Sequence, residues 1–485
     1  MNEELKGLQP QKIFGFFGEI LAIGRPSKKE EKMSQYLYDW GQKKGLETIR
    51  DQIGNVLIRK NATKGYENKA SVCLQSHMDM VCEKNSDKAF DFERDVIETY
   101  VDNGWLRAKG TTLGADDGIG VATALAILDS DDIEHGDIEC LFTVDEETGL
   151  SGAEALSEDM LKSRILINLD SEDEGEIFIG CAGGKDTVAT LKYEKDGVPE
   201  GCAYYKVMVK GLKGGHSGDD INKGLACANK VLNRILWTID RKYDIRLACF
   251  DGGNLRNAIA REAYAVIVAD KKDVDLMKDI KALGDDIRFE FRSTEPDMQV
   301  VIEETEKPAF VIDVLTQDNL LNVLYACPHG VMAMSREIPN FVETSTNLAS
   351  VKMDDEYIIV TTSQRSSVES AKQAACDRIN ACFSLVNADV WHGDGYPGWT
   401  PNPNSEILKV AEQSYERLFG KKPVVRAIHA GLECGLIGEK YESMDMISYG
   451  PTLRGVHSPD ERLEIATVDM FWRHTLDILK NVPNK

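Results

Sequence analysis

The sequence lacks the features that mark secreted, membrane-spanning and nucleic-acid-binding proteins. Its first 28 residues contain no basic segment followed by an apolar core, so no secretion signal is expected. The longest apolar run, residues 121–128, is too short to cross a bilayer. Basic side chains number 57 against 81 acidic ones, and the net charge of −24 disfavours nucleic acids and anionic membranes. We therefore expect a cytoplasmic protein with no nucleic-acid or membrane partner.

Cysteine pairs and the common hydrolase signatures are also missing from the sequence. The eleven cysteines are scattered with no CxxC spacing, which argues against a disulfide framework and a cysteine zinc site. The HExxH zinc helix, the GxSxG nucleophile turn and the phosphate-binding P-loop do not occur. A single-zinc protease, a serine hydrolase and a nucleotide hydrolase of these types therefore have no support.

The pattern of apolar segments predicts two domains, one inserted into the other. The chain of 485 residues exceeds the size of one ordinary core. Strand-like and helical segments alternate in the first part, which is typical of an α/β domain with a mixed, largely parallel sheet. The next part predicts a strand at 204–209 and helices at 219–235 and 366–386. We expect a catalytic domain at 1–187 and 390–485, interrupted by an α+β domain at 188–389.

Three predicted strands end in side chains that can bind metal ions. Each apolar run (70–74, 138–144 and 165–169) precedes candidate ligands, which are His77 and Asp79, Glu146 and Glu147, and Asp170 respectively. Ligands of an open α/β sheet bind at the carboxyl ends of its strands, so these side chains are expected in one crevice. When each acid is taken alone, a helix cap or a solvated turn explains it better than a metal site does. Together they favour a metal site, because several unpaired acids at buried strand ends call for a cation.

Two further motifs offer ligands from distant parts of the chain. Asp116 lies in a glycine-rich loop before a predicted helix, where its carboxylate could bridge two cations. The alternative is that Asp116 or Asp117 caps that helix. His457 follows a turn-rich segment and would add a second imidazole. A set of two histidines and three carboxylates suits zinc, cobalt or manganese.

Several motifs in order along the chain resemble one group of metallopeptidases. They include residues 76–79, 114–118, 145–149, 214–218 and 429–435. This series resembles the aminoacylase/carboxypeptidase clan of two-zinc metallopeptidases, and within it the bacterial aminoacyl-histidine dipeptidases, also called cytosolic non-specific dipeptidases or peptidase D. The resemblance implies a zinc-peptidase (phosphorylase/hydrolase-like) catalytic domain interrupted by a lid and dimerisation domain.

The resemblance also implies a role for each candidate residue of the metal centre. Two divalent ions are expected, zinc first and cobalt or manganese as alternatives. The implied ligands are His77 and Asp170 for one ion, Glu147 and His457 for the other, and Asp116 as the bridge. Glu146 is implied as the general base, and Asp79 as the partner that orients the His77 ring.

Three residues of the inserted domain are implied to bind substrate. His216 would donate to the oxyanion, in its own or a partner's site, and Arg365 and Asn257 would hold the terminal carboxylate and backbone. The alternatives are an exposed turn histidine, a surface arginine and a turn asparagine. The expected activity is hydrolysis of unblocked dipeptides, including Xaa-His and β-alanyl-histidine, by a homodimer. A deacylase of N-acyl amino acids or a carboxypeptidase of the same clan is the alternative.

Overall fold

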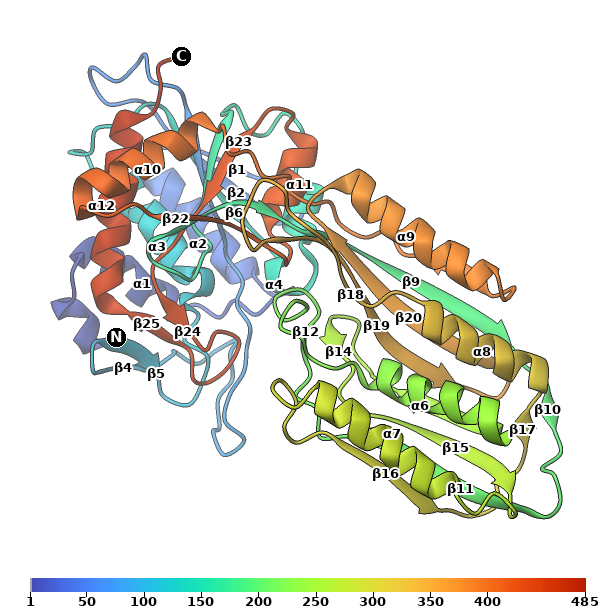
Figure 1. The fold of residues 1–485 in the computed structure, drawn as a ribbon. Coiled ribbons are helices and arrows are strands. Elements are labelled where there is room, and N and C mark those ends of the chain that lie inside the picture. The colour runs from blue at the N-terminus through green and yellow to red at the C-terminus, as the bar shows by residue number, and fades with distance from the viewer. Residues whose placement is uncertain (1) are drawn as a thin grey trace. The chain divides into compact units, whose positions relative to one another are not determined.

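The structure, a computed structural model, describes residues 2–485 and divides the chain into two compact units (Figure 1). Unit 1 comprises the residues up to Gly180 together with Pro401–Ala427 and Leu432–Lys485, and unit 2 comprises Cys181–Thr400 and Ile428–Gly431. The inserted domain predicted at 188–389 lies within unit 2, which extends beyond it at both ends. The reason is that β9 (Gly183–Lys192) and β21 (Asp389–His392) pair with each other in the sheet of unit 2.

Unit 1 is built around an eight-stranded sheet with the order β1-β2-β6-β3-β7-β23-β8-β22. Its strands are β1 (Glu47–Arg50), β2 (Val56–Lys60), β3 (Val72–His77), β6 (Ile138–Thr143), β7 (Ile165–Asn168), β8 (Glu176–Cys181), β22 (Val424–Ile428) and β23 (Asp445–Ser448). The central pairs β6–β3, β3–β7 and β7–β23 are parallel, whereas β1–β2, β2–β6 and β23–β8 are antiparallel. This mixed sheet confirms the predicted α/β class.

The central strands form where the sequence predicts them, and their ends define one edge of the sheet. Every residue of β3 and β6 is buried, as expected for parallel strands covered on both faces. The register pairs His77 with Thr143 and Gln75 with Asn168. The carboxyl ends of β3, β6 and β7 therefore lie side by side, and the loops that follow them share this edge.

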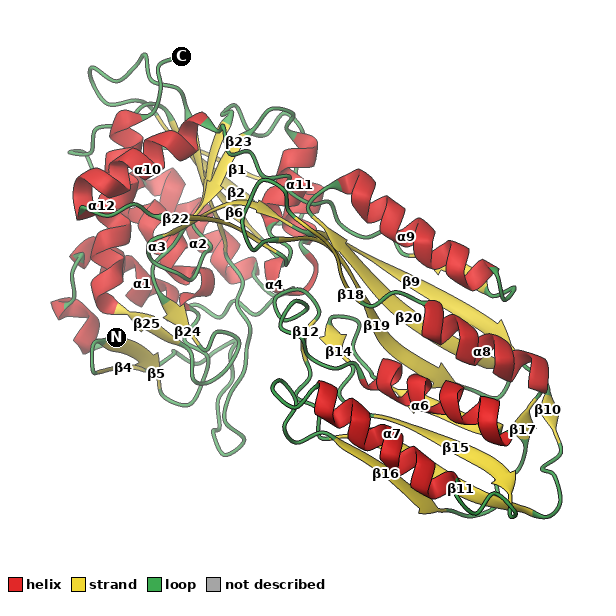
Figure 2. Cartoon of the chain, in the orientation of Figure 1, coloured by secondary structure: helices red, strands yellow, loops and turns green. Residues whose placement is uncertain are grey.

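Helices cover the central sheet of unit 1, and a separate small sheet belongs to the same unit (Figure 2). The helices are α1 (Gln11–Ile20), α2 (Glu31–Lys43), α3 (Ala115–Leu128), α4 (Glu146–Gly149), α5 (Ser151–Ala155), α10 (Glu406–Phe419), α11 (Glu433–Lys440) and α12 (Ile465–Asn481), with a 3-10 helix at Glu3–Gly7. The small sheet has the order β24 (Leu453–Arg454), β25 (Arg462–Glu464), β5 (Trp105–Ala108) and β4 (Thr99–Asp102). Helix α3 packs on both β3 and α1, so all of its residues except Asp116 are buried and most are apolar.

Unit 2 contains a nine-stranded antiparallel sheet with helices on one face (Figure 2). The sheet consists of β9, β21, β11 (Cys202–Lys210), β13 (Arg246–Gly252), β15 (Ala263–Asp270), β16 (Gln299–Glu304), β18 (Gly330–Met334), β19 (Val342–Met353) and β20 (Tyr357–Ser366). The helices are α6 (Ala228–Tyr243), α7 (Leu276–Glu290), α8 (Val314–Ala326) and α9 (Glu369–Ser384), and the apolar core lies between helices and sheet. Two short ladders, β10 (Lys195–Asp196) with β17 (Val311–Ile312) and β12 (Gly215–His216) with β14 (Ala258–Ile259), complete the unit.

Two predicted helices of unit 2 start too early in the sequence. The helix predicted at 219–235 begins only at Ala228, because Gly224 adopts a left-handed φ of 69° and the Asp220 carboxylate binds the N–H of His216 to close a turn. The helix predicted at 366–386 begins at Glu369, since Ser366 is the last residue of β20. Across residues 2–485, no helix combines the length and the apolar character that a bilayer crossing requires.

Candidate active site

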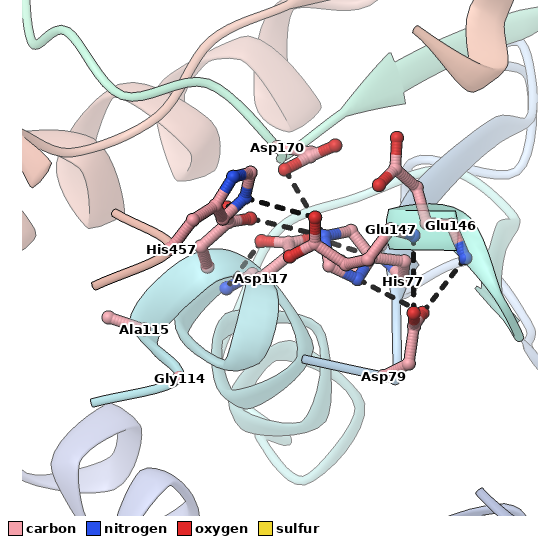
Figure 3. A network of polar contacts seen from close by, with 12 residues as sticks. His77, Asp79, Gly114, Ala115, Asp117, Glu146, Glu147, Asp170 and His457 are labelled. Carbon is pink, nitrogen blue, oxygen red and sulfur yellow. Dashed lines mark hydrogen bonds and ion pairs between the residues drawn. The ribbon is translucent and has the colours of Figure 1, made fainter. Parts of the chain in front are cut away.

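The five predicted metal ligands converge in unit 1 (Figure 3). His77 Nε2 lies 3.1 Å from Asp116 Oδ1 and 3.5 Å from Asp170 Oδ1. His457 Nε2 lies 3.2 Å from Asp116 Oδ2 and 3.0 Å from Glu147 Oε2. The two oxygens of Asp116 therefore face two different imidazoles. The end of β3, the short helix α4 that follows β6, the loop after β7, the start of α3 and the turn before β25 bring these side chains together. They are far apart in the sequence.

The donor set fits divalent metal ions. Ligand atoms within 4.8 Å of one another form three groups, which are His77–Asp116–Asp170, Asp116–Glu147–His457 and His77–Glu146–Glu147. Within residues 2–485, the buried Oε1 of Glu147 finds no hydrogen-bond donor, an uncompensated position that a cation would satisfy. Nitrogen and oxygen donors of this kind suit zinc, cobalt or manganese. Asp116, like His77 and Glu147, belongs to two of the groups, and its two oxygens face the different imidazoles of His77 and His457.

Asp79 connects the His77 ring to the start of α4, which carries Glu146 and Glu147. Its Oδ1 lies 3.3 Å from His77 Nδ1 and accepts the N–H of Glu146 at 3.0 Å, while its Oδ2 accepts the N–H of Glu147 at 3.2 Å and the hydroxyl of Ser27 at 2.8 Å. The side chain is fully buried. Burial opposes ionisation, but the contacts with His77 and these donors lower the pKa of Asp79 to about 2. An ionised Asp79 fixes the ring so that Nε2 faces Asp116 and Asp170.

The charges of the centre compensate one another through shifted pKa values. Hydrogen bonds that His457 donates to the carboxylates of Asp116 and Glu147 raise the pKa of His457 to about 11. Burial, with the negative charge of Asp116 added, raises the pKa of Asp170 well above its usual value despite the opposing effect of His77. A cluster so rich in carboxylates holds positive charge as protons or as metal ions, and metal binding would release the protons.

Glu146 lies beside the proposed metal ligands, and its surroundings favour the protonated form of its carboxyl group. Burial raises the pKa of Glu146 well above its usual value, against the charge of His77 and with the charges of Asp170 and Glu433 added. Glu433 is itself fully buried, and its Oε2 accepts from Gln75 Nε2 at 2.6 Å and from Thr143 Oγ1 at 2.7 Å. A carboxyl group with a raised pKa exchanges protons near neutral pH, which is the property that a general base and acid needs.

Asp117 belongs to none of the three candidate ligand groups and instead hydrogen-bonds main-chain groups beside them. Its Oδ1 accepts the N–H of Gly120 at 3.2 Å, so it caps the start of α3, which the sequence offered as one alternative. Its Oδ2 accepts the N–H of His77 at 3.2 Å, which joins the end of β3 to the start of α3.

Arg25 is a supporting residue that no feature of the sequence indicates. It is 1% exposed, and its Nη1 donates to the carbonyl groups of Met78 at 3.1 Å and Asp79 at 2.5 Å, while Nη2 donates to that of Gly114 at 2.5 Å. The guanidinium thus ties the loop after β3 to the loop before α3. Main-chain carbonyls carry no residue-specific signal, so only the structure could reveal these contacts.

We expect Arg25→Met to lower the free energy of unfolding by about 3 kcal/mol, because three buried carbonyl groups lose a charged donor. Urea unfolding followed by circular dichroism measures the change. Arg94→Met is the matched control, since the Arg94 side chain is 82% exposed. A loss below ~1 kcal/mol would show that the loops hold together without Arg25.

The three predicted substrate residues gather within unit 2. His216 in β12 lies opposite Ala258 of β14, next to Asn257, whose carbonyl accepts the N–H of Ser217 at 2.7 Å. Arg365 in β20 is 7% exposed and donates from Nε to Ser217 Oγ at 3.4 Å. The structure therefore brings these residues together around Ser217, although Ser217 and Arg365 are 148 positions apart in the sequence.

The hydrogen bonds of this cluster orient its donors. His216 Nδ1 accepts the N–H groups of Gly218 and Asp219, both at 3.3 Å, and lies 3.5 Å from Asp219 Oδ2. These contacts all engage Nδ1 and fix the orientation of the ring. Arg365 Nη1 donates to the hydroxyl of Tyr396 at 2.9 Å, a contact that fixes the plane of the guanidinium. Tyr396 belongs to the aromatic, glycine-rich segment 395–399 and had no predicted role.

The class of protein follows from the sheet, the ligand groups and a match of residues 73–480 to the model of peptidase family M20/M25/M40. The chain belongs to this family and is a hydrolase that acts on peptide bonds. Cytosol non-specific dipeptidase of Escherichia coli (strain K12) is 41% identical over 483 residues, which cover 99% of this chain and 100% of that protein. The predicted resemblance is thereby confirmed.

Solved structures agree with this assignment. Aminoacylhistidine dipeptidase from Vibrio alginolyticus has a TM-score of 0.93 and 42% identity, with 100% of this chain and 99% of that one covered. Aminopeptidase PepT from Bacillus cereus has a TM-score of 0.58 at 16% identity, with 98% and 99% covered, and shares the fold.

Proposed function

We propose that this chain hydrolyses unblocked dipeptides, including Xaa-His dipeptides and β-alanyl-histidine, with two divalent metal ions. The observation that carries the proposal is the position of Asp116, whose Oδ1 faces His77 and whose Oδ2 faces His457. One carboxylate shared by two ligand groups is what a two-metal hydrolase requires. The full-length identity to a dipeptidase supports the substrate class. The proposed ligands are His77, Asp116, Glu147, Asp170 and His457.

Residues of the chain would supply proton transfer and orientation around these ions. When bound, two divalent ions polarise a carbonyl group and lower the pKa of water at the site. Glu146 would take the proton of the attacking water and pass it to the leaving nitrogen, for which its raised pKa is suited. Asp79 would hold the His77 ring in place throughout.

The cluster around Ser217 would provide the substrate contacts. Arg365 would bind the terminal carboxylate through its guanidinium, and Asn257 would bind the substrate backbone. His216 would donate from Nε2 to the oxyanion, an assignment that the contacts of its Nδ1 favour. We further propose that zinc is the metal, that the protein acts in the cytosol, and that unit 2 serves as lid and as dimer interface.

A panel of four substrates tests the activity. The zinc-loaded protein is incubated with β-alanyl-histidine, Ala-Ala, tri-alanine and N-acetyl-alanine, and the released amino acids are quantified. We expect both dipeptides to be cleaved, with turnover of the other two compounds at least about tenfold lower, because an unblocked amino end and a carboxylate must both be recognised at the separation that a dipeptide gives them. Cleavage of the acetylated compound alone would replace the proposal by a deacylase. Light scattering on the same sample tests the homodimer.

A further inference from the structure

Glu461 binds a loop from the other end of the chain with both oxygens of its carboxylate. Oε2 accepts the N–H groups of Leu113 at 2.7 Å and Gly114 at 3.0 Å, and Oε1 accepts those of Ala115 at 2.8 Å and Asp116 at 3.3 Å. The side chain is 2% exposed. One buried carboxylate thus holds four consecutive main-chain N–H groups, the last of which belongs to the proposed bridging residue.

The local conformation explains why these four groups converge on one side chain. They precede or begin α3, and the first N–H groups of a helix have no partner within the helix itself. Gly114 adopts a left-handed φ of 67°, which turns neighbouring N–H groups toward a common point. A Cβ at this position would lie 2.6 Å from Arg25 Nη2, so only glycine fits. A carboxylate has four lone-pair sites, and the four donors occupy this full capacity.

Glu461 also belongs to the same tight turn as His457. The hydroxyl of Ser458 donates to the carbonyl of Gly455 at 2.7 Å, and the N–H of Glu461 donates to the carbonyl of Ser458 at 3.0 Å. His457 has a left-handed φ of 60°, a conformation that a non-glycine residue holds only when its surroundings impose it. A displacement of Glu461 would therefore be transmitted to the His457 ring.

We infer that Glu461 is a positioning residue of the metal centre, which sets the separation between the Asp116 carboxylate and the His457 imidazole. This inference rests on the proposed metal ligation. Glu461 is not itself a ligand, because its oxygens are occupied by N–H groups; it acts through Asp116 on one side and through the turn of His457 on the other. Outer partners of this kind typically change metal affinity by 10–100-fold.

The variant that tests the inference is Glu461→Gln, which keeps the size of the side chain. Its amide nitrogen would face two N–H donors instead of accepting from them, so two hydrogen bonds are lost. Zinc affinity is measured by competition with a chromophoric chelator, and the cobalt-substituted protein is examined by absorption spectroscopy. We expect a ~10–100-fold loss of zinc affinity and an altered cobalt spectrum. Glu461→Asp keeps the charge with a shorter reach and should recover part of the loss.

The matched control is Asp460→Asn, which removes one charge from the neighbouring exposed residue. It should bind zinc as the unchanged protein does. The melting temperature of each metal-free protein is also recorded. A Glu461→Gln protein that melts earlier but keeps its zinc affinity and its cobalt spectrum would overturn the inference, because Glu461 would then contribute only to stability.

Two further outcomes have defined meanings. If Glu461→Gln does not fold, the same measurements on Glu461→Asp decide, and unchanged affinity and spectrum there would overturn the inference. If the unchanged protein binds no divalent metal, the proposed function fails and the inference with it. Normal binding in the unchanged protein and in Glu461→Gln alike removes the inference and leaves the proposed function standing.

Discussion

The Glu146→Gln protein is expected to retain its metal ions and to lose about 10³-fold in kcat on a dipeptide substrate. Glutamine preserves the size of the side chain, but its amide cannot accept a proton from the attacking water or return one to the leaving nitrogen. Glu146 is partly buried beside the ligand groups, and its raised pKa suits it for both transfers. Steady-state kinetics and metal analysis of the same preparation measure the two quantities.

The metal analysis is needed because the structure gives Glu146 a second candidate role. Its carboxylate is close enough to His77 and Glu147 to form a ligand group with them. Loss of metal together with activity would therefore identify Glu146 as a ligand, and a kcat within about threefold of the unchanged protein would reject both roles. Glu154→Gln serves as the control, since Glu154 is exposed on α5 and carries the same charge.

We expect Asp116→Ala to lose both metal ions and all measurable turnover. The two oxygens of Asp116 face the imidazoles of His77 and His457, so its removal takes one donor from each proposed site. The two sites would also lose the one carboxylate that is proposed to bind both ions. Metal analysis after gel filtration should fall from about two ions per chain to fewer than one.

Asp170→Ala is the comparison variant that distinguishes a bridging ligand from a ligand of one ion. Asp170 contacts His77 at 3.5 Å and belongs to one ligand group only. We therefore expect its removal to release about one ion per chain. If Asp116→Ala also released a single ion, Asp116 would be an ordinary ligand of one site and the two-metal arrangement would need another bridge.

The sequence predicted the central elements of unit 1 well because their signals are local. Continuous apolar runs at 138–144 and 165–169 became β6 and β7 within one residue at each end. The physical reason is that a strand buried on both faces must be apolar throughout, whatever its neighbours are. The prediction of a helix at 219–235 failed where Gly224 and the Asp220 side chain close a turn, since a turn of this kind competes with an otherwise helical pattern.

The candidate site divides in the same way. Strand ends indicated His77, Glu147 and Asp170, because an acid or histidine after a buried strand is visible in the sequence itself. Asp116 and His457 came mainly from the resemblance. Nothing in the sequence indicated Arg25 or Glu461 as supports, although Glu461 stands four residues after His457.

The sequence alone determined the α/β class of the catalytic unit, the order of the candidate ligands and the resemblance to two-metal peptidases, because each of these is carried by residue type and spacing. Only the tertiary structure decided which atoms face one another. Asp116 turns one oxygen to each imidazole, and Glu461 gathers four N–H groups from a loop some 345 residues away. A contact to a main-chain group does not depend on the residue type at the contacted position. Such contacts can therefore be identified only in the folded structure.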